Sequence, residues 1–248
     1  MSIMVTVDWD FFVIEKPHWD MGHQESPLFL DVLWAHRYGL RNEMKTTGHE
    51  KDFWNIVGNL LPISENADIH VSDSHLYAYP AANDCEGIFL FDAHHDCWET
   101  RESGKVQCDN WLRIWLEENE ERWAVWVYPE HARWQGAPEL PEDMVGRIDV
   151  VTWKVFAEHP ELVPGKETVD TLHICRSGCW TPPWLDQAFI DFFSEGCSPH
   201  DYHIQQDGIW NPMKLRWDEE TESKAKSMLE KTNEMMAESA KKMMSSQK

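Results

Sequence analysis

An apolar run that leads directly into a cluster of acids and histidines is the feature that most constrains this chain. Residues 87–91 read Gly-Ile-Phe-Leu-Phe, and residues 92–96 read Asp-Ala-His-His-Asp. A short run without polar side chains is typical of a strand covered on both faces, as in a parallel sheet between helices. Two acids and two histidines at the end of such a strand are costly to bury without partners. We therefore expect a central strand that ends at a metal site.

Other apolar runs alternate with amphipathic stretches along the chain. We predict further strands over 3–7, 67–71, 123–128, 148–153 and 171–175. We predict helices, from apolar side chains at helical spacing or from a proline in the first turn, over 27–40, 52–61, 109–118 and 183–193. Strands that alternate with helices favour an α/β layer fold with a mostly parallel sheet.

The C-terminal segment differs from the rest. Residues 218–248 contain no proline, glycine or aromatic residue. Apolar pairs recur there at roughly seven- to eight-residue spacing, namely Met228 and Leu229, Met235 and Met236, and Met243 and Met244. This pattern predicts a long amphipathic helix with a narrow apolar stripe. We therefore divide the chain into a globular domain over 1–217 and a C-terminal helix over 218–248. That helix either docks on its own domain or serves self-association or partner binding.

Charge and composition narrow the function classes. The 248 residues include 22 basic and 44 acidic side chains, which gives a net charge of −22. A nucleic-acid partner requires a cationic surface and is not expected, whereas a metal ion or a cationic substrate would suit this charge. The sequence lacks both a long apolar run typical of a membrane helix and the basic flank of a signal peptide. We therefore expect a cytoplasmic protein whose six cysteines stay reduced.

Acids and histidines follow two other predicted strands as well. Asp8 and Asp10 follow the strand at 3–7, and His75 follows the strand at 67–71. Ligands of open parallel α/β sheets bind beyond the carboxyl ends of the strands, so these side chains can converge. Carboxylate and imidazole together suit manganese, iron or zinc. The candidate ligands exceed what one tetrahedral zinc needs and suit two metals that share carboxylates. They are Asp8, Asp10, His75, Asp92, His94 and Asp96.

The three candidate ligands at the end of the apolar strand alternate along the chain. If the strand continues, Asp92, His94 and Asp96 share one face. His95 would then point away or lie at the turn above the metals.

These motifs resemble those of the arginase (ureohydrolase) superfamily, which also includes agmatinases and, more distantly, histone deacetylases. Residues 91–96 are similar to its Asp-Ala-His-x-Asp motif, residues 72–75 to its Gly-Gly-Asp-His segment, and residues 8–12 to its Asp-x-Asp motif. The resemblance implies a three-layer αβα fold and two manganese ions. In the family, Asp-x-Asp follows the Asp-Ala-His motif, whereas here it precedes it, and the strand at 172–177 carries no acid. A rearranged strand order, with the N-terminal strand in the vacant place, would reconcile the two patterns.

The Asp-x-Asp-Phe-Phe sequence most resembles the peptide arginases, which convert arginine to ornithine within ribosomally made peptides. The resemblance implies a ligand set for each manganese, with Asp8 and Asp92 in both. One set is His75, Asp92, Asp96 and Asp8, and the other is Asp92, His94, Asp8 and Asp10. Iron and zinc stay open as alternatives, because they accept the same ligand types.

We therefore expect a manganese-dependent hydrolase in which a metal-bridging hydroxide releases urea from peptidyl-arginine. Asp96 and His95 are the candidate proton donors, although His95 could instead orient a ligand. A carboxylate should bind the guanidinium. The candidates by proximity to the motifs are Glu15, Asp20, Asp73 and Asp109, of which Asp109 could instead cap a helix.

Three other functions stay open at this point. One is hydrolysis of free arginine or agmatine, which needs a compact pocket. Another is zinc-dependent deacylation, which needs only one metal. The third is metal or partner binding without catalysis, in which the C-terminal helix would matter most. Fifteen tryptophans would suit an open aromatic cleft for a peptide.

Overall fold

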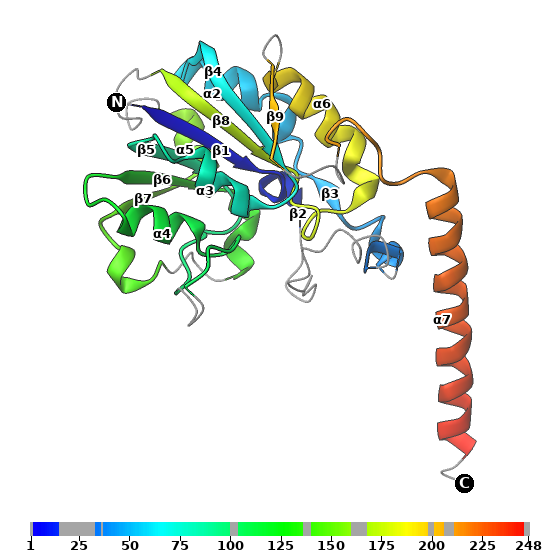
Figure 1. Ribbon diagram of the computed structural model, residues 1–248. Helices are drawn as coiled ribbons and strands as arrows, with labels where there is room; N and C mark the ends of the chain where they lie inside the picture. The colour runs from blue at the N-terminus through cyan, green and yellow to red at the C-terminus, as the bar shows by residue number, and fades with distance from the viewer. Residues whose placement is uncertain are drawn as a thin grey trace.

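The computed structural model describes residues 2–14, 33–35, 37–99, 104–135, 140–159, 168–197, 201–205 and 211–245. This part of the chain contains a seven-stranded sheet in the order β7-β6-β5-β1-β8-β4-β9, and all of its strand pairs are parallel (Figure 1). A short antiparallel pair, β2 (Val13–Ile14) and β3 (Lys45–Thr46), lies outside it. The prediction of an α/β fold with a mostly parallel sheet is confirmed.

Most strands have nearly the bounds that the apolar runs predict. They are β1 (Ile3–Asp8), β4 (Ile63–Ser72), β5 (Gly87–Phe91), β6 (Trp123–Tyr128), β7 (Ile148–Thr152), β8 (Val169–Cys175) and β9 (His203–Ile204). β4 begins four residues before its predicted start, at Ile63, and its register against β8 shifts between Ile63 and Asp68. β7 ends one residue early because the Thr152 hydroxyl accepts a hydrogen bond from the amide of Val155 and caps the next helix.

Helices cover both faces of the sheet, which makes three layers. The side chains of β1 alternate between the faces, as expected for a strand. Val5 and Val7 pack with α2 (Phe53–Leu60), α5 (Trp153–Glu158) and α6 (Asp186–Cys197), whereas Met4 packs with α3 (Ala78–Ala81) and α4 (Trp111–Glu117). The fold is therefore a three-layer αβα arrangement, and its central strands β1, β5 and β8 are largely buried because both faces are covered.

The helices of the structure differ from the predicted ones mainly at their ends. The helix predicted over 183–193 begins as a 3-10 turn, η8 (Pro183–Leu185), before α6 continues to Cys197. Half of the helix predicted over 27–40 lies outside the described residues. Within it, 33–35 are helical and η2 (Tyr38–Leu40) is a 3-10 turn.

A cluster of aromatic rings anchors the chain directly after β1. The 3-10 turn η1 (Trp9–Phe12) buries its side chains completely. Phe12 contacts Phe53 and Phe192 at ring-centroid distances of 5.3 and 4.9 Å. Burying each such ring contributes about 1.5–3 kcal/mol. This packing fixes the backbone that carries Asp8 and Asp10.

The C-terminal segment is helical, as predicted. α7 (Glu219–Ser245) packs its first turns on the body of the protein and then extends away from it (Figure 1). Ala225 is fully buried beside Ala35 and Tyr38. Among the described residues, no helix combines the length and the apolar character needed to cross a bilayer.

Candidate metal centre

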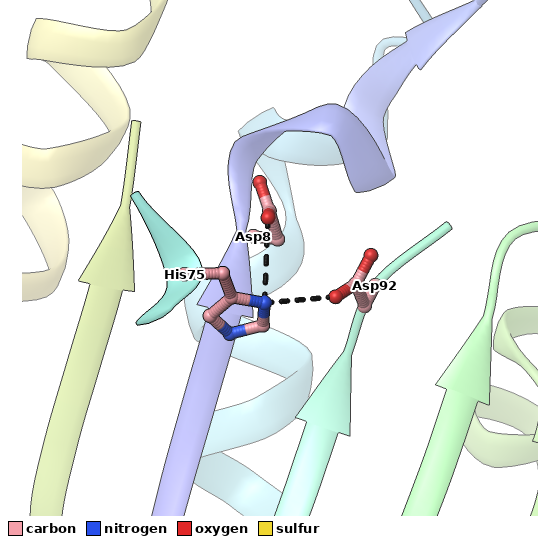
Figure 2. A group of neighbouring side chains, drawn as sticks. All are labelled: Asp8, His75 and Asp92. Carbon is pink, nitrogen blue, oxygen red and sulfur yellow. Dashed lines mark ion pairs between the residues drawn. The ribbon is translucent and has the colours of Figure 1, made fainter. Parts of the chain in front are cut away.

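Three strands bring acids and histidines to one edge of the sheet. Asp8 is the last residue of β1, and Asp92 directly follows β5, the neighbour of β1. His75 begins a 3-10 turn, η4 (His75–Tyr77), shortly after β4. Figure 2 shows the imidazole of His75 facing both carboxylates across the ends of the strands. The fold therefore brings the three motifs together at the carboxyl ends of the strands, as predicted.

One group of side chains surrounds Nδ1 of His75. This atom lies 3.3 Å from Oδ2 of Asp8, 2.9 Å from Oδ2 of Asp92 and 2.8 Å from Oδ2 of Asp96. All four side chains are buried. The ring is held from behind, because Nε2 lies 2.9 Å from the hydroxyl of Thr6 in the middle of β1.

A second group surrounds Nδ1 of His94. This atom lies 3.0 Å from Oδ2 of Asp10 and 3.6 Å from Oδ1 of Asp92. Backbone amides fix both carboxylates, since the amide of His94 donates to Asp92 over 2.7 Å and the amide of Ala93 donates to Asp10 over 3.4 Å. Asp92 therefore belongs to both groups.

The donor atoms of the two groups fit divalent metal ions. Asp8, His75 and Asp92 each offer one ligand atom, and these atoms lie within 4.8 Å of one another. The same holds for Asp10, Asp92 and His94. Three of the inward-facing atoms are buried without a hydrogen bond of acceptable geometry, namely Oδ2 of Asp10, Oδ2 of Asp92 and Nδ1 of His75. Buried polar atoms normally have partners, so this set of atoms could hold metal ions.

The electrostatics of the cluster reflect crowded negative charge. Burial raises the pKa of Asp8 well above its usual value, and the charges of Asp10 and Asp92 raise it further. Burial and the charge of Asp92 raise the pKa of Asp96 as well. Burial alone would lower the pKa of His75, but the neighbouring carboxylates of Asp92, Asp96 and Asp8 raise it well above the usual range. A cation at this place, whether a proton or a metal, therefore relieves the repulsion.

The turn after β5 differs from the predicted continuing strand. The strand ends at Phe91, and Asp96 has a positive φ of 50°. The carbonyl of Asp96 accepts the amide of Leu112 over 3.2 Å at the start of α4, and its carboxylate accepts the indole N–H of Trp111 over 2.6 Å. The prediction that Asp92, His94 and Asp96 share one face of a continuing strand is therefore wrong. A turn closed on the Asp92 carboxylate and tied to α4 brings the ligands together instead.

The imidazole of His95 packs among aromatic rings. Its ring contacts those of Trp98 and Trp126 at 4.7 and 5.6 Å. Its Nδ1 accepts the amide of Cys97 over 2.9 Å, which supports the turn. Burial lowers the pKa of this imidazole below its usual value.

A cavity of about 100 Å³ opens over the acids and histidines. Its floor and walls are formed by Asp8, His75, His94, Asp96, Trp98, Cys108, Asp109, Ser177 and Trp180. The ring of Trp180 lies 5.0 Å from that of His94, and Trp98 is more than half exposed at 55%. The cavity therefore combines an acidic floor with aromatic walls.

The four candidate carboxylates for binding a guanidinium do not share one location. Asp109 lines the cavity, and the N-cap position of α4 is occupied by Asn110. Asp73 is buried and pairs with the guanidinium of Arg216 in this chain. Glu15 and Asp20 lie outside the described residues.

Sequence reasoning missed the contribution of the segment after β8. Ser177, which has a positive φ of 53°, and Trp180 both line the cavity. β8 lies between β1 and β4, the strands that lead to Asp8 and His75. Ser177 lies two residues after a predicted strand, and this position could have indicated a place near the site. The indication is useful only when the sheet order is known, and the sequence does not give that order.

Comparisons with known proteins add no relationship: no family model, no curated protein and no solved structure matches this chain. The geometry of the site carries the functional argument.

Proposed function

We propose that this protein is an arginase-like hydrolase with two manganese ions, which converts arginine side chains of a peptide to ornithine and releases urea. The observation that carries the proposal is the sharing of Asp92 between two groups of ligand atoms at the floor of a cavity. One carboxylate common to two groups is what a pair of metal ions requires. Mixed carboxylate and imidazole ligands suit manganese, although iron and zinc accept the same types.

Two bound ions would supply a hydroxide nucleophile at neutral pH. The ligand residues would hold the ions through side chains that the protein fixes: Asp92 accepts the amide of His94, and Asp96 accepts the indole N–H of Trp111. We assign proton transfer to the leaving amine to Asp96, because it lines the cavity. His95 does not line it, so we assign His95 to supporting the turn that carries the ligands.

The walls of the cavity support a flat cationic substrate. Asp109 places a carboxylate in the lining, and carboxylates pair with guanidinium groups through two parallel hydrogen bonds. The indole rings of Trp98 and Trp180 can stack on such a cation. Trp98 lines the cavity and is also more than half exposed, so its ring could contact the rest of a peptide chain, which favours peptidyl-arginine over free arginine or agmatine.

Metal content and urea release test this proposal together. We expect elemental mass spectrometry of protein purified with manganese to give about two ions per chain, and urea to form from arginine-containing peptides. One zinc per chain with amide hydrolysis would replace the proposal with a deacylase. Metal without any turnover on arginine, agmatine or arginine peptides would reduce the protein to a metal-binding one.

The Asp92→Asn variant tests the shared ligand. Since Asp92 belongs to both groups, we expect this variant to lose both ions and all urea release while it keeps its fold. Asp149→Asn is the matched control, because Asp149 is an exposed aspartate of β7 and should keep metal and activity. Circular dichroism checks that the Asp92→Asn protein is folded. Full metal content in that folded variant, measured by elemental mass spectrometry, would contradict the assignment of Asp92 as the shared ligand.

A further inference from the structure

A chain of buried hydrogen bonds lies directly behind His75, on the side away from the carboxylates. Nε2 of His75 lies 2.9 Å from the hydroxyl of Thr6, which lies 3.0 Å from Nδ1 of His173. Nε2 of His173 lies 3.0 Å from the hydroxyl of Ser72, which donates to the carbonyl of Ser74 over 2.8 Å. Thr6, Ser72 and His173 are all fully buried.

The carbonyl of Ser74 determines which group donates and which accepts in every hydrogen bond of this series. A carbonyl oxygen only accepts, so the single hydroxyl hydrogen of Ser72 is committed to Ser74. The hydrogen between Ser72 and His173 must then belong to Nε2 of His173. Both ring nitrogens of His173 contact neutral hydroxyls, and an imidazolium buried this way would lack an anionic partner. His173 is therefore neutral, with its hydrogen on Nε2 and a bare Nδ1.

The same logic continues to His75. A bare Nδ1 of His173 accepts the hydroxyl hydrogen of Thr6, which leaves the oxygen of Thr6 to accept from Nε2 of His75. With this hydrogen fixed on Nε2, His75 in its neutral form, the form that binds a metal, presents the lone pair of Nδ1. That atom is the one that faces Asp8, Asp92 and Asp96.

We propose that Thr6 and His173 are positioning residues that hold His75 in the tautomer and orientation of a metal ligand. Metal-binding histidines commonly donate their second N–H to an acceptor that fixes the ring, and here the acceptor is a threonine oriented by a second histidine. The rings of His75 and His173 also stack, with centroids 5.7 Å apart and an angle of 6° between planes. β8 thus carries no ligand but supplies the residue that orients one. The inference rests on the metal-binding part of the proposed function and not on the reaction.

Manganese affinity of three threonine variants tests this role. Thr6→Val removes the hydroxyl at nearly constant shape, and we expect its manganese affinity, measured by calorimetric titration, to fall 10–100-fold, the usual effect of losing such a partner. Thr6→Ser keeps the hydroxyl and should bind within a few-fold of the unmodified protein. Thr171→Val is the control, since Thr171 is a buried threonine of the neighbouring strand without a link to His75 in the hydrogen bonds described. Unchanged affinity in Thr6→Val, or an equal loss in Thr6→Ser, would overturn the proposal.

The position of the hydrogen on His173 gives a second readout that needs neither metal nor turnover. Long-range proton–nitrogen NMR correlation on protein labelled with ¹⁵N-histidine should show His173 neutral, with hydrogen on Nε2 alone. A hydrogen on Nδ1, or a charged ring, would overturn the proposal even if the protein binds manganese. Conversely, the expected tautomer in a protein without urea release would leave the positioning role intact and refute only the proposed reaction.

Discussion

At the scale of single residues, the neighbours of a charged side chain determine whether it can bind a ligand. Asp73 has the residue type expected for a guanidinium-binding carboxylate, yet it already binds the guanidinium of Arg216. The amide of Arg216 in turn donates to Asp186 over 2.8 Å, and Asp186 pairs with the buried Arg176. These pairs join the loop after β8 to the segment that precedes α7. Removing one member of such a network leaves a buried charge without its partner, which is costly.

Gly178 shows how tightly this network is packed. A Cβ at Gly178 would lie 2.6 Å from both Nη1 of Arg216 and Oδ1 of Asp73. We expect Gly178→Ala to lower the free energy of unfolding by about 1–3 kcal/mol, because the ion pair must move. Urea denaturation measures the loss.

The control is a glycine with space around it. A Cβ at Gly58 in α2 would meet nothing within 4 Å, so Gly58→Ala should raise stability by about 0.5–1 kcal/mol through helix propensity. Equal effects of the two substitutions would contradict the argument from packing.

At the scale of elements, α7 has two parts with different surroundings. Its first turns belong to the body, since Ala225, Met228 and Leu229 pack beside Tyr38, whose hydroxyl donates to Glu222. Met235, further along, is 71% exposed. Trp217, the last residue of the expected globular domain, stacks on Tyr38 at 5.6 Å, so it packs together with the first turns of α7.

Two truncations separate these parts. A chain that ends at Lys231 keeps the packed turns and should keep its stability within about 0.5 kcal/mol. A chain that ends at Trp217 exposes the apolar surface around Tyr38 and should lose about 2–4 kcal/mol. Thermal and urea unfolding of both proteins check this, and equal losses would show that the outer part of α7 also contributes to stability.

At the scale of the whole molecule, buried neutral histidines couple stability to pH. Burial lowers the pKa of His131 to about 4 and that of His173 well below its usual value. An unfolded histidine titrates near 6.5, so between these values the unfolded chain binds more protons than the folded one. The contribution of these two histidines to stability is therefore lost as the pH falls below about 6.5.

His131 provides the test of this linkage. Going from pH 7 to pH 5 should cost the protein no more than about 2 kcal/mol through His131, since its side chain is partly exposed and solvent screens part of the effect. His131→Gln should remove this part of the pH dependence, measured by urea unfolding of metal-free protein at both pH values. An unchanged slope in the variant would assign the acid sensitivity to other groups.

The sequence by itself determined the local features of this protein. Apolar runs located most of the strands of the sheet because burial on both faces leaves a short-range pattern, and β5 and β6 have the predicted bounds. The residue types after three strands indicated a metal site before their distances were known, because buried acids and histidines need a cation or another partner.

Only the tertiary structure decided which side chains meet. Pairing β1 with both β5 and β8 depends on contacts between segments far apart in the chain, which no local pattern encodes. That order brings Asp8 beside Asp92, and it also places His173 behind His75 through Thr6. The turn at Asp96 likewise depends on its contact with Trp111 rather than on strand periodicity. Local sequence thus indicated the candidate ligands, whereas long-range packing set their geometry, because side-chain periodicity is a short-range property and sheet order is not.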